Sequence, residues 1–301
     1  MKIGRAAWLT DTGRRRTRNE DAYVFEPPLF AIADGMGGAR AGEVAAGIAA
    51  TALRDGRRDV IDEASLEASI EEANRRVWER SVADPSTAGM GTTVTVALVH
   101  GGDGEIVFGH VGDSRAYRLR GDVLEQITTD HSLVAELVES GVLTPEEAET
   151  HPQRSAITRA VGTESAIEID VFTVPGEPGE LFLLCSDGLT DMLSEEAIAS
   201  ALLDADRDPE RAAERLVAAA NARGGEDNIT VVLFELVEGD PDPVLYEDTA
   251  VDGEADDAGS ADPDRGVKRH GAGSGGRLIS LALIATVLVV GVLAMYWGIN
   301  R

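Results

Sequence analysis

The run TTVTVALVHGGDGEIVFGHVGDSRAYRLRGDVLEQI, residues 92–127, decides the fold of this chain. It contains four short stretches of β-branched, aliphatic and aromatic residues, separated by turn residues such as Gly121 and Asp122. These stretches are residues 92–99, 105–111, 114–119 and 123–127. Short apolar runs joined by tight turns are typical of strands that follow one another in a meander. The run therefore predicts antiparallel sheet at the centre of the chain.

Helical patterns flank this meander. Residues 42–53 and 62–82 predict two helices before it, and residues 209–221 predict a third near the end of the folded part. In the second helix, apolar residues recur every three or four positions and form one face: Leu66, Ile70, Ala73 and Val77. Residues 181–185 and 229–234 predict buried strands. Helices and strands do not alternate regularly, so we expect an α+β fold with mostly antiparallel sheet.

Residues 130–165 interrupt this pattern with a polar, weakly helical sequence that contains Pro145, Pro152 and Gly162. An insertion of this length in a compact domain is usually functional, often as a lid. We therefore expect a flap at about residues 130–165, inside a domain that spans residues 1–239.

The charge and cysteine content exclude several classes of protein. The chain has 27 basic and 54 acidic residues, a formal net charge of −27, which disfavours nucleic-acid binding. Its only lysines are Lys2 and Lys268, so it has no lysine-containing phosphate loop. This composition suits a high-salt cytosol, although a GC-rich genome also favours arginine over lysine. Cys185 is the only cysteine, and Asp191 stands where a cysteine phosphatase would need arginine.

The C-terminal part has a different composition. Residues 240–277 are rich in Asp, Gly, Ser, Ala and Pro and predict a disordered linker. Residues 278–297 contain no charged residue, and a helix of that length spans about 30 Å, so they predict a transmembrane helix. Basic residues before this helix outnumber those after it: Arg265, Lys268, Arg269 and Arg277 against Arg301. The positive-inside rule then predicts a single-pass protein of the cell membrane whose folded domain faces the cytoplasm.

Aspartates stand beside glycine or at the ends of apolar runs: Asp21, Asp34, Asp113, Asp187 and Asp227. Each of them alone is compatible with a simple turn, because Asp-Gly is a common turn dipeptide. Strand ends can bring several carboxylates together, and such a cluster needs a cation to offset its repulsion. Oxygen-only ligands are typical of Mg²⁺ or Mn²⁺. The set as a whole therefore favours a site for a hard divalent cation.

Six groups of residues stand in a fixed order along the folded part: TDTG with Arg16 and NED at 10–21, ADGMGG at 33–38, GTT at 91–93, HVGDSR at 110–115, SDGLTD at 186–191 and EDNIT at 226–230. Their order and wording resemble those of the metal-dependent protein serine/threonine phosphatases of type 2C, the PPM family, in their bacterial and archaeal form. The resemblance covers about residues 3–236. It implies a four-layer α-β-β-α sandwich of two antiparallel sheets flanked by helices, with metal ions in a cleft at one edge.

The resemblance also implies a ligand set for two Mn²⁺ or Mg²⁺ ions. Asp34 would bridge both ions, and Gly35 would offer its backbone carbonyl to one of them. Asp187 and Asp227 would bind the other ion. Water activated by the ions would attack the phosphorus directly, without a covalent enzyme intermediate.

Further roles follow from the same resemblance. Glu20 and Asp21 would hold waters bound to the ions, and Asp113 would bind a third ion together with Asp187. Ser155, in the flap, is a weaker candidate for that third site. Arg16 occupies the place of the family's phosphate-binding arginine, where a bidentate fork would offset the charge of the phosphoryl oxygens. The alternative for Arg16 is a solvated charge.

The sequence departs from the family pattern at the positions where relatives have a histidine that could act as general acid. Many relatives have a histidine directly after the motif that ends at Gly38, where this chain has Ala39 and then Arg40. Eukaryotic relatives have a histidine at the position of Met36. His131 is a candidate for the role, although a histidine in such a position is more often structural.

The sequence thus predicts an enzyme that hydrolyses phosphoserine and phosphothreonine in proteins at the cytoplasmic face of a membrane. Its expected partners are phosphoproteins, including a serine/threonine protein kinase. The alternative from another class is a catalytically weak relative that binds phosphoproteins at the membrane. Retention of Asp34, Asp187 and Asp227 favours the enzyme.

Overall fold

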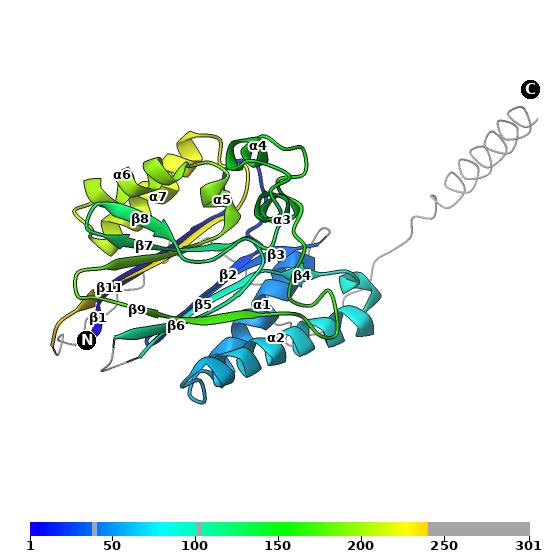
Figure 1. Cartoon of the computed structure of the whole chain (residues 1–301). Coiled ribbons are helices and arrows are strands. Elements are labelled where there is room, and N and C mark those ends of the chain that lie inside the picture. The colour runs from blue at the N-terminus through cyan, green and yellow to red at the C-terminus, as the bar shows by residue number, and fades with distance from the viewer. Residues whose placement is uncertain (38–40, 101–103, 240–301) are drawn as a thin grey trace, which may run out of the picture. The chain divides into compact units, whose positions relative to one another are not determined.

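The computed structural model describes residues 1–37, 41–100 and 104–239 of the chain. Two antiparallel sheets lie face to face, and helices cover both outer faces (Figure 1). The predicted α+β class and the four-layer α-β-β-α arrangement are therefore confirmed for this part of the chain. The first sheet has the strand order β1 (Lys2–Asp11), β11 (Ile229–Val237), β10 (Leu181–Cys185), β7 (Arg115–Arg120) and β8 (Val123–Gln126).

The first two strands of the second sheet carry the candidate aspartates Asp21 and Asp34. Its strand order is β2 (Asp21–Glu26), β3 (Leu29–Met36), β5 (Val94–Val99), β6 (Glu105–Val111) and β9 (Asp170–Pro175). The two-residue strand β4 (Gly91–Thr92) pairs with the end of β3. All described strand pairs are antiparallel.

The helices divide between the two outer faces. The second sheet is covered by α1 (Ala41–Gly56) and α2 (Glu63–Ala83), which lie below the sheets in Figure 1. The first sheet is covered by α5 (Asp187–Thr190), α6 (Glu195–Asp204) and α7 (Pro209–Ala222). A short 3₁₀ helix, η1 (Pro85–Thr87), follows α2. Two further helices, α3 (Leu133–Glu139) and α4 (Pro145–Glu149), lie in the segment 130–165 that was predicted to form a flap.

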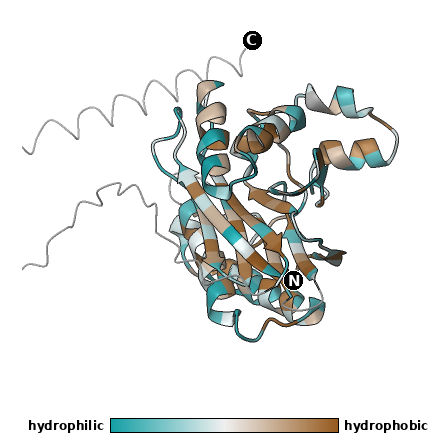
Figure 2. Ribbon diagram, turned by 90° about the vertical axis from the view of Figure 1, so that its left-hand side faces the viewer, coloured by the Kyte–Doolittle hydropathy of each residue, from teal (hydrophilic) through white to brown (hydrophobic). Residues whose placement is uncertain are grey.

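Layering explains the hydropathy of the strands. Every residue of β5 and β10 is buried, since each strand has a sheet on one side and helices on the other. Such strands are continuous apolar runs and do not alternate between apolar and polar residues. Figure 2 shows these hydrophobic stretches in brown along the strands and hydrophilic stretches in teal on the helices. The predicted face of α2 is also buried against its sheet, at Leu66, Ile70, Ala73 and Val77.

The predicted meander is correct strand by strand, but its strands do not form one sheet. β5 and β6 belong to the second sheet, and β7 and β8 belong to the first. The chain crosses between the sheets at Gly112, whose φ of 115° lies in the region that favours glycine. The prediction of one strand over residues 92–99 is wrong in one detail, because β4 ends at Thr92 and β5 begins at Val94. The sequence pattern did not identify β1, β2, β9 or α6.

Within the described ranges, no helix is long and apolar enough to cross a membrane. The linker predicted at 240–277 and the transmembrane helix predicted at 278–297 both lie outside the described residues.

Aromatic rings fill the space between the two sheets. Phe182 on β10 stacks on Phe234 of β11, with ring centroids 5.1 Å apart, and Phe234 stacks on Phe30 of the opposite sheet at 4.6 Å. Phe108, on β6 of that opposite sheet, has its centroid 6.3 Å from that of Phe182. These rings are 0% exposed, so they hold the two sheets together through close packing.

Replacing Phe182 with alanine should lower the free energy of unfolding by about 3–5 kcal/mol, because it opens a cavity between the sheets. Val123→Ala is the matched control, since this side chain is among the exposed large hydrophobics and its loss should cost within about 0.5 kcal/mol. Chemical denaturation of both variants beside the parent measures the difference. Equal stability of the two variants would contradict the role of this aromatic layer.

Candidate metal centre

Asp34 lies near the carboxyl end of β3, where hydrogen bonds hold the strand on both sides. It stands opposite Asp21 in the β2–β3 register. On the other side, Asp34 N donates to Thr93 Oγ1 at 3.0 Å, and Thr93 N donates to Asp34 O at 2.9 Å. Thr92 Oγ1 also donates to Asp34 O, at 2.8 Å. The backbone of Asp34 is therefore fixed, and its carboxylate remains available to the site.

Asp21 links the second sheet to the first. Its Oδ2 accepts hydrogen bonds from Ser186 Oγ at 2.9 Å and from Thr230 Oγ1 at 2.6 Å. Thr230 Oγ1 also lies 2.7 Å from Thr10 Oγ1, so the contact extends to β1. The two donors leave Oδ1 of Asp21 free to face the aspartates of the other strand ends.

Asp187 stands two residues after the end of the buried strand β10 and begins the short helix α5. Ser186, the residue before it, is fully buried and is held by Thr230 N, which donates to Ser186 Oγ at 2.9 Å. The end of β10 is thus anchored to β11 at the point where the Asp187 side chain enters the site.

Asp227 precedes β11 and is positioned by its neighbour Asn228. The buried Asn228 side chain donates to Thr12 O at 3.0 Å and to Arg18 O at 2.8 Å, and its Oδ1 accepts from Glu20 N at 2.8 Å. These bonds fold the segment between β1 and β2 onto the start of β11. As a result, Glu20 and Asp227 lie on the same side of the fold as Asp21.

Arg16 forms an ion pair with Asp227 in the candidate site. Its Nη2 lies 2.5 Å from Asp227 Oδ2, in a pair whose side chains are 50% and 33% exposed. The residue predicted to bind phosphate therefore contacts a residue predicted to bind metal. Because the arginine is half-exposed, its fork is accessible from solvent.

Gly35 is required by close packing at the end of β3. A Cβ atom at this position would lie 2.3 Å from Gly42 O and 2.4 Å from Glu20 O, both of them backbone atoms. Only glycine allows the start of α1 and the Glu20 segment to approach the strand so closely. The same packing places Glu20 beside Gly35, as the predicted site requires.

Burial, and after it the charges of neighbouring carboxylates, raise the pKa of several of these aspartates. Burial and the charges of Asp187, Asp21 and Asp113 hold the pKa of Asp34 well above its ordinary range. Burial, with the charges of Asp113, Asp191 and Asp227, does the same for Asp187. Burial raises the pKa of Asp21 to about 6, although the bonds from Thr230 and Ser186 lower it. Carboxyls that perturb one another in this way form one electrostatic cluster.

Two buried oxygens show that this cluster suits a cation. Oδ1 of Asp21 and Oδ1 of Asp187 accept no hydrogen bond from any residue that the structure describes. A buried carboxylate oxygen without a donor is costly, and a divalent cation would remove that cost. Within the described residues, however, no three carboxylate, histidine or cysteine side chains already form a finished ligand set. The individual ligand roles therefore stay predictions.

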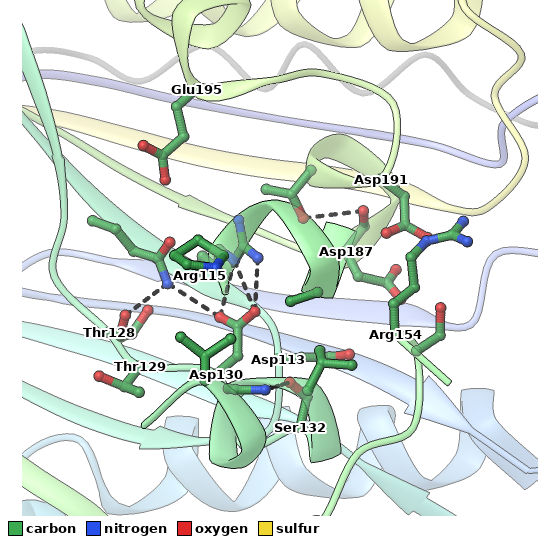
Figure 3. A pocket seen from close by; sticks show the side chains of 18 of the residues that line it. Asp113, Arg115, Thr128, Thr129, Asp130, Ser132, Arg154, Asp187, Asp191 and Glu195 are labelled. Atoms are coloured by element: carbon green, nitrogen blue, oxygen red, sulfur yellow. Dashed lines mark hydrogen bonds and ion pairs between the residues drawn. The ribbon is translucent and has the colours of Figure 1, made fainter. Parts of the chain in front are cut away.

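Asp113 borders a cavity of about 900 Å³ that opens beside Asp187. Figure 3 shows Asp113, Asp187 and Asp191 along this cavity, with Arg154 of the flap beside Asp191. Burial and the charge of Asp130 raise the pKa of Asp113 to about 6. The structure thus brings Asp113 to Asp187, and the flap helices α3 and α4 form the opposite wall.

The weaker candidates lie in different places. Ser155 is exposed and lines the cavity on the flap side, as does its neighbour Arg154. His131 is only 5% exposed, and it does not line this cavity. A general acid must reach the leaving group, so the position of His131 favours the structural alternative.

Several residues that shape the site were not predicted individually. Ser186, Thr230 and Asn228 stand in the motifs that carried the resemblance, but their hydrogen bonds join strands that are distant in sequence. Arg115 and Asp130 form a bidentate ion pair on the floor of the cavity, with Arg115 Nη2 2.7 Å from Asp130 Oδ2 (Figure 3). The position of Ser186 beside Asp187, and of Asn228 beside Asp227, is the sequence signal that could have found these two residues.

Comparisons with known proteins agree with this geometry. Residues 13–220 match the family model described as protein phosphatase 2C. The serine/threonine phosphatase stp of Listeria innocua is 40% identical over 242 residues, which cover 76% of this chain and 95% of that protein.

Solved structures match over the same part of the chain. The crystal structure of the Mycobacterium tuberculosis serine/threonine phosphatase PstP/Ppp has a TM-score of 0.73 and 39% identity, covering 78% of this chain and 99% of that one. The catalytic domain of PstP in complex with 2 manganese ions has a TM-score of 0.71 and 37% identity, with coverage of 78% and 99%. With the family model, the identity and the four-layer fold all in agreement, the chain belongs to the protein phosphatase 2C family.

Proposed function

We propose that this chain hydrolyses phosphoserine and phosphothreonine in proteins, using Mn²⁺ or Mg²⁺ held by the aspartate cluster. The observation that carries the proposal is the convergence of Asp21, Asp34, Asp113 and Asp187, whose pKa values are all raised by burial and by neighbouring carboxylates, with Oδ1 of Asp21 and of Asp187 buried and without a hydrogen-bond donor among the described residues. Membership of the protein phosphatase 2C family supports it, as do relatives named serine/threonine phosphatases.

Each residue of the site has a distinct task in this proposal. Asp34, Asp187 and Asp227 hold two cations together with the backbone carbonyl of Gly35, and Asp113 holds a third with Asp187. Bound there, the cations supply the positive charge that acidifies a water molecule and neutralises phosphoryl oxygens.

Asp21 and Glu20 stand beside the proposed ligands and would orient water. Ser186 and Thr230 keep Oδ2 of Asp21 occupied, so only its Oδ1 turns to the site. That oxygen, with Glu20, would orient water around the cations.

Arg16 would bind the substrate's phosphoryl group. Its guanidinium pairs with Asp227 at 2.5 Å, so it already lies at the rim of the cluster, and half of its side chain is exposed. A planar fork in that position can contact two phosphoryl oxygens at once. With Asp227 engaged in holding a cation, the half-exposed guanidinium would be available to the substrate.

We further propose that residues 278–297 anchor the enzyme in the cell membrane and that its catalytic domain faces the cytoplasm. The uncharged run and the basic residues before it support this orientation. A linker of flexible composition would let the domain reach phosphoproteins near the membrane, among them a serine/threonine protein kinase.

Asp187→Asn should lower turnover by several orders of magnitude while the domain still folds, because the substitution removes a charge that holds the cations. Asp122→Asn is the matched control, at an aspartate whose side chain is 83% exposed on a turn. The assay is Mn²⁺-dependent hydrolysis of a phosphopeptide by the full-length chain, with chelator as the blank. A variant that retains activity within about tenfold of the parent would refute the metal assignment. A parent that binds phosphopeptides but does not hydrolyse them would support the binding-module alternative.

Arg16→Ala should raise the KM for phosphopeptide more than it weakens metal binding. The expected loss of transition-state stabilisation is about 2.7–4 kcal/mol, the usual effect of removing one preorganised donor. Arg15→Ala is the control, because Arg15 is the exposed neighbour in the same arginine run. Steady-state kinetics give the comparison, and a larger effect of Arg15 would show that the wrong arginine was assigned.

Truncation after Val237 should give a protein that leaves the membrane fraction and keeps full activity on a small phosphoester, since all candidate site residues precede that position. Full-length chain should resist an alkaline wash of membranes and should dephosphorylate membrane-bound substrates faster, because anchoring raises the effective concentration. Cell fractionation and protease protection in intact cells test the location. Release of the full-length chain by the wash, or digestion of its catalytic domain from outside, would show that the proposed anchor or orientation is wrong.

A further inference from the structure

His131 lies where three parts of the chain meet behind the candidate site: the β6–β7 turn, the flap and β9. Its backbone N–H donates to Gly112 O at 2.7 Å, and its carbonyl accepts from Thr158 N at 2.8 Å. Its ring Nδ1 accepts from Gly112 N at 3.1 Å, and its Nε2 lies 3.1 Å from Asp170 Oδ2. Every polar group of this buried residue therefore has a partner.

These contacts define the tautomer of the ring. An Nδ1 atom that accepts from an N–H carries no proton, so the neutral ring carries its proton on Nε2, which donates to Asp170 Oδ2. Arg159 Nη1 lies 3.3 Å from the same Nε2, but two donors do not bond to each other, so Arg159 acts on the carboxylate of Asp170 instead. Partial burial acts to raise the pKa of Asp170, but the bond from His131 and the charge of Arg159 lower it. Arg159 Nη1 lies 3.0 Å from Asp170 Oδ1, which holds the carboxylate from its other side.

A second histidine keeps the ring in place. His110 is 0% exposed, and its ring centroid is 4.8 Å from that of His131. Its Nδ1 lies 3.0 Å from Thr95 Oγ1, and its Nε2 lies 3.1 Å from Thr129 O. The His131 ring is thus packed and bonded on all sides, and it cannot rotate without breaking these contacts.

The β6–β7 turn that His131 holds is the one that carries Asp113. Gly112 adopts a φ of 115°, and a Cβ atom there would lie 2.6 Å from Thr93 Cβ. On the β7 side of Asp113, the buried Ser114 holds the turn through its Oγ, 2.7 Å from Thr93 Oγ1, and through its carbonyl, which accepts from Thr95 Oγ1 at 3.1 Å. On the β6 side, Gly112 has no side chain, so its position depends on its backbone hydrogen bonds. His131 bonds to both the N–H and the carbonyl of Gly112, one residue before Asp113.

We propose that His131 is a positioning residue that fixes the Asp113 turn to the base of the flap and so sets the affinity of the cation site to which Asp113 contributes. The inference rests on the proposed function, because it assigns a metal ligand role to Asp113. Through its bond with Thr158 in the flap and its bond with Asp170 on β9, the same residue joins the flap, the edge of the second sheet and the turn. Outer partners of this kind typically change metal affinity by about 10–100-fold when they are lost.

Two substitutions of His131 distinguish the contact that Nδ1 makes with Gly112 from the contact that Nε2 makes with Asp170. Asn places its Oδ1 near the position of Nδ1, so His131→Asn keeps an acceptor for Gly112 N and loses the bond to Asp170. Gln places its Nε2 near the position of the ring Nε2, so His131→Gln keeps the bond to Asp170 and loses the acceptor for Gly112. Each variant retains one of the two contacts, and an equal loss of general stability is expected for both.

The experiment uses the full-length chain and two readouts that do not depend on turnover. Calorimetric titration with Mn²⁺ defines the Asp113-dependent site as the one that Asp113→Ala abolishes. His131→Gln should weaken that site at least about tenfold, whereas His131→Asn should leave it close to the parent. Hydrogen exchange of the amide of Gly112 should accelerate in His131→Gln and stay slow in His131→Asn.

Equal Mn²⁺ affinities in the two variants, or a parent without an Asp113-dependent site, would overturn the proposal. It would also be overturned if His131→Gln weakened the remaining sites equally in an Asp113→Ala background, since the effect would then not act through Asp113. These results are distinguishable from failure of the proposed function, which would appear as a parent chain that does not hydrolyse phosphopeptide with Mn²⁺.

Discussion

Mutual repulsion of the aspartates is the constraint around which this domain is organised. Burial and the charges of Asp187, Asp21 and Asp113 hold the pKa of Asp34 well above its ordinary range, and burial with the charges of Asp113, Asp191 and Asp227 does the same for Asp187. Carboxylates left to themselves would separate, so the backbone must hold them. It does so at the ends of strands, where the antiparallel register, the threonine contacts of Asp34 and the Ser186–Thr230 pair beneath Asp21 leave little room to move. Burial of hydrophobic residues in three clusters, one between the sheets and one on each outer face, offsets the unfavourable free energy of bringing the aspartates together.

The four layers explain why the site can be both rigid and open. Strands buried on both faces hold Asp34 and Asp187 at the point where they emerge from the sheets. The aromatic layer between the sheets prevents one sheet from sliding over the other, and so keeps β3 in line with β10. Beyond the strand ends, the described part of the chain forms loops and the flap, and these leave a cavity beside Asp113 and Asp187. The packed core therefore makes the site rigid, and the cavity at the described strand ends gives access to it.

Many of the strands and helices, and the aspartates of the candidate site, could be predicted from the sequence, for physical reasons that differ between elements. Long apolar runs such as those of β6 and β10 specify buried strands, and the 3.6-residue period of α2 specifies a helix. β9 was missed because its residues are only half-buried and alternate weakly, and β1 because it mixes arginine with small residues. The crossing between sheets at Gly112 depends on which strands pair, and pairing is a property of the whole chain. The aspartates themselves were found, because a carboxylate at the end of an apolar run is visible in sequence. Their supporting donors were not, because Ser186 and Thr230 are distant from Asp21 along the chain.

The candidate ligands differ in how they are supported, and this difference bears on their roles. Asp34 lies near the end of β3 and Asp187 stands two residues after β10, and both strands are buried over most of their length, so the sheets fix the backbone at these positions. Asp113 stands instead on a glycine turn between sheets, held by His131 and through it by the flap. A ligand on a core strand can hold a cation in every state of the enzyme. A ligand on a turn joined to the flap can do so only while the flap keeps its place. On our proposal, the cluster therefore has a part held by the strand ends and a part, at Asp113, whose cation affinity depends on contacts with the flap.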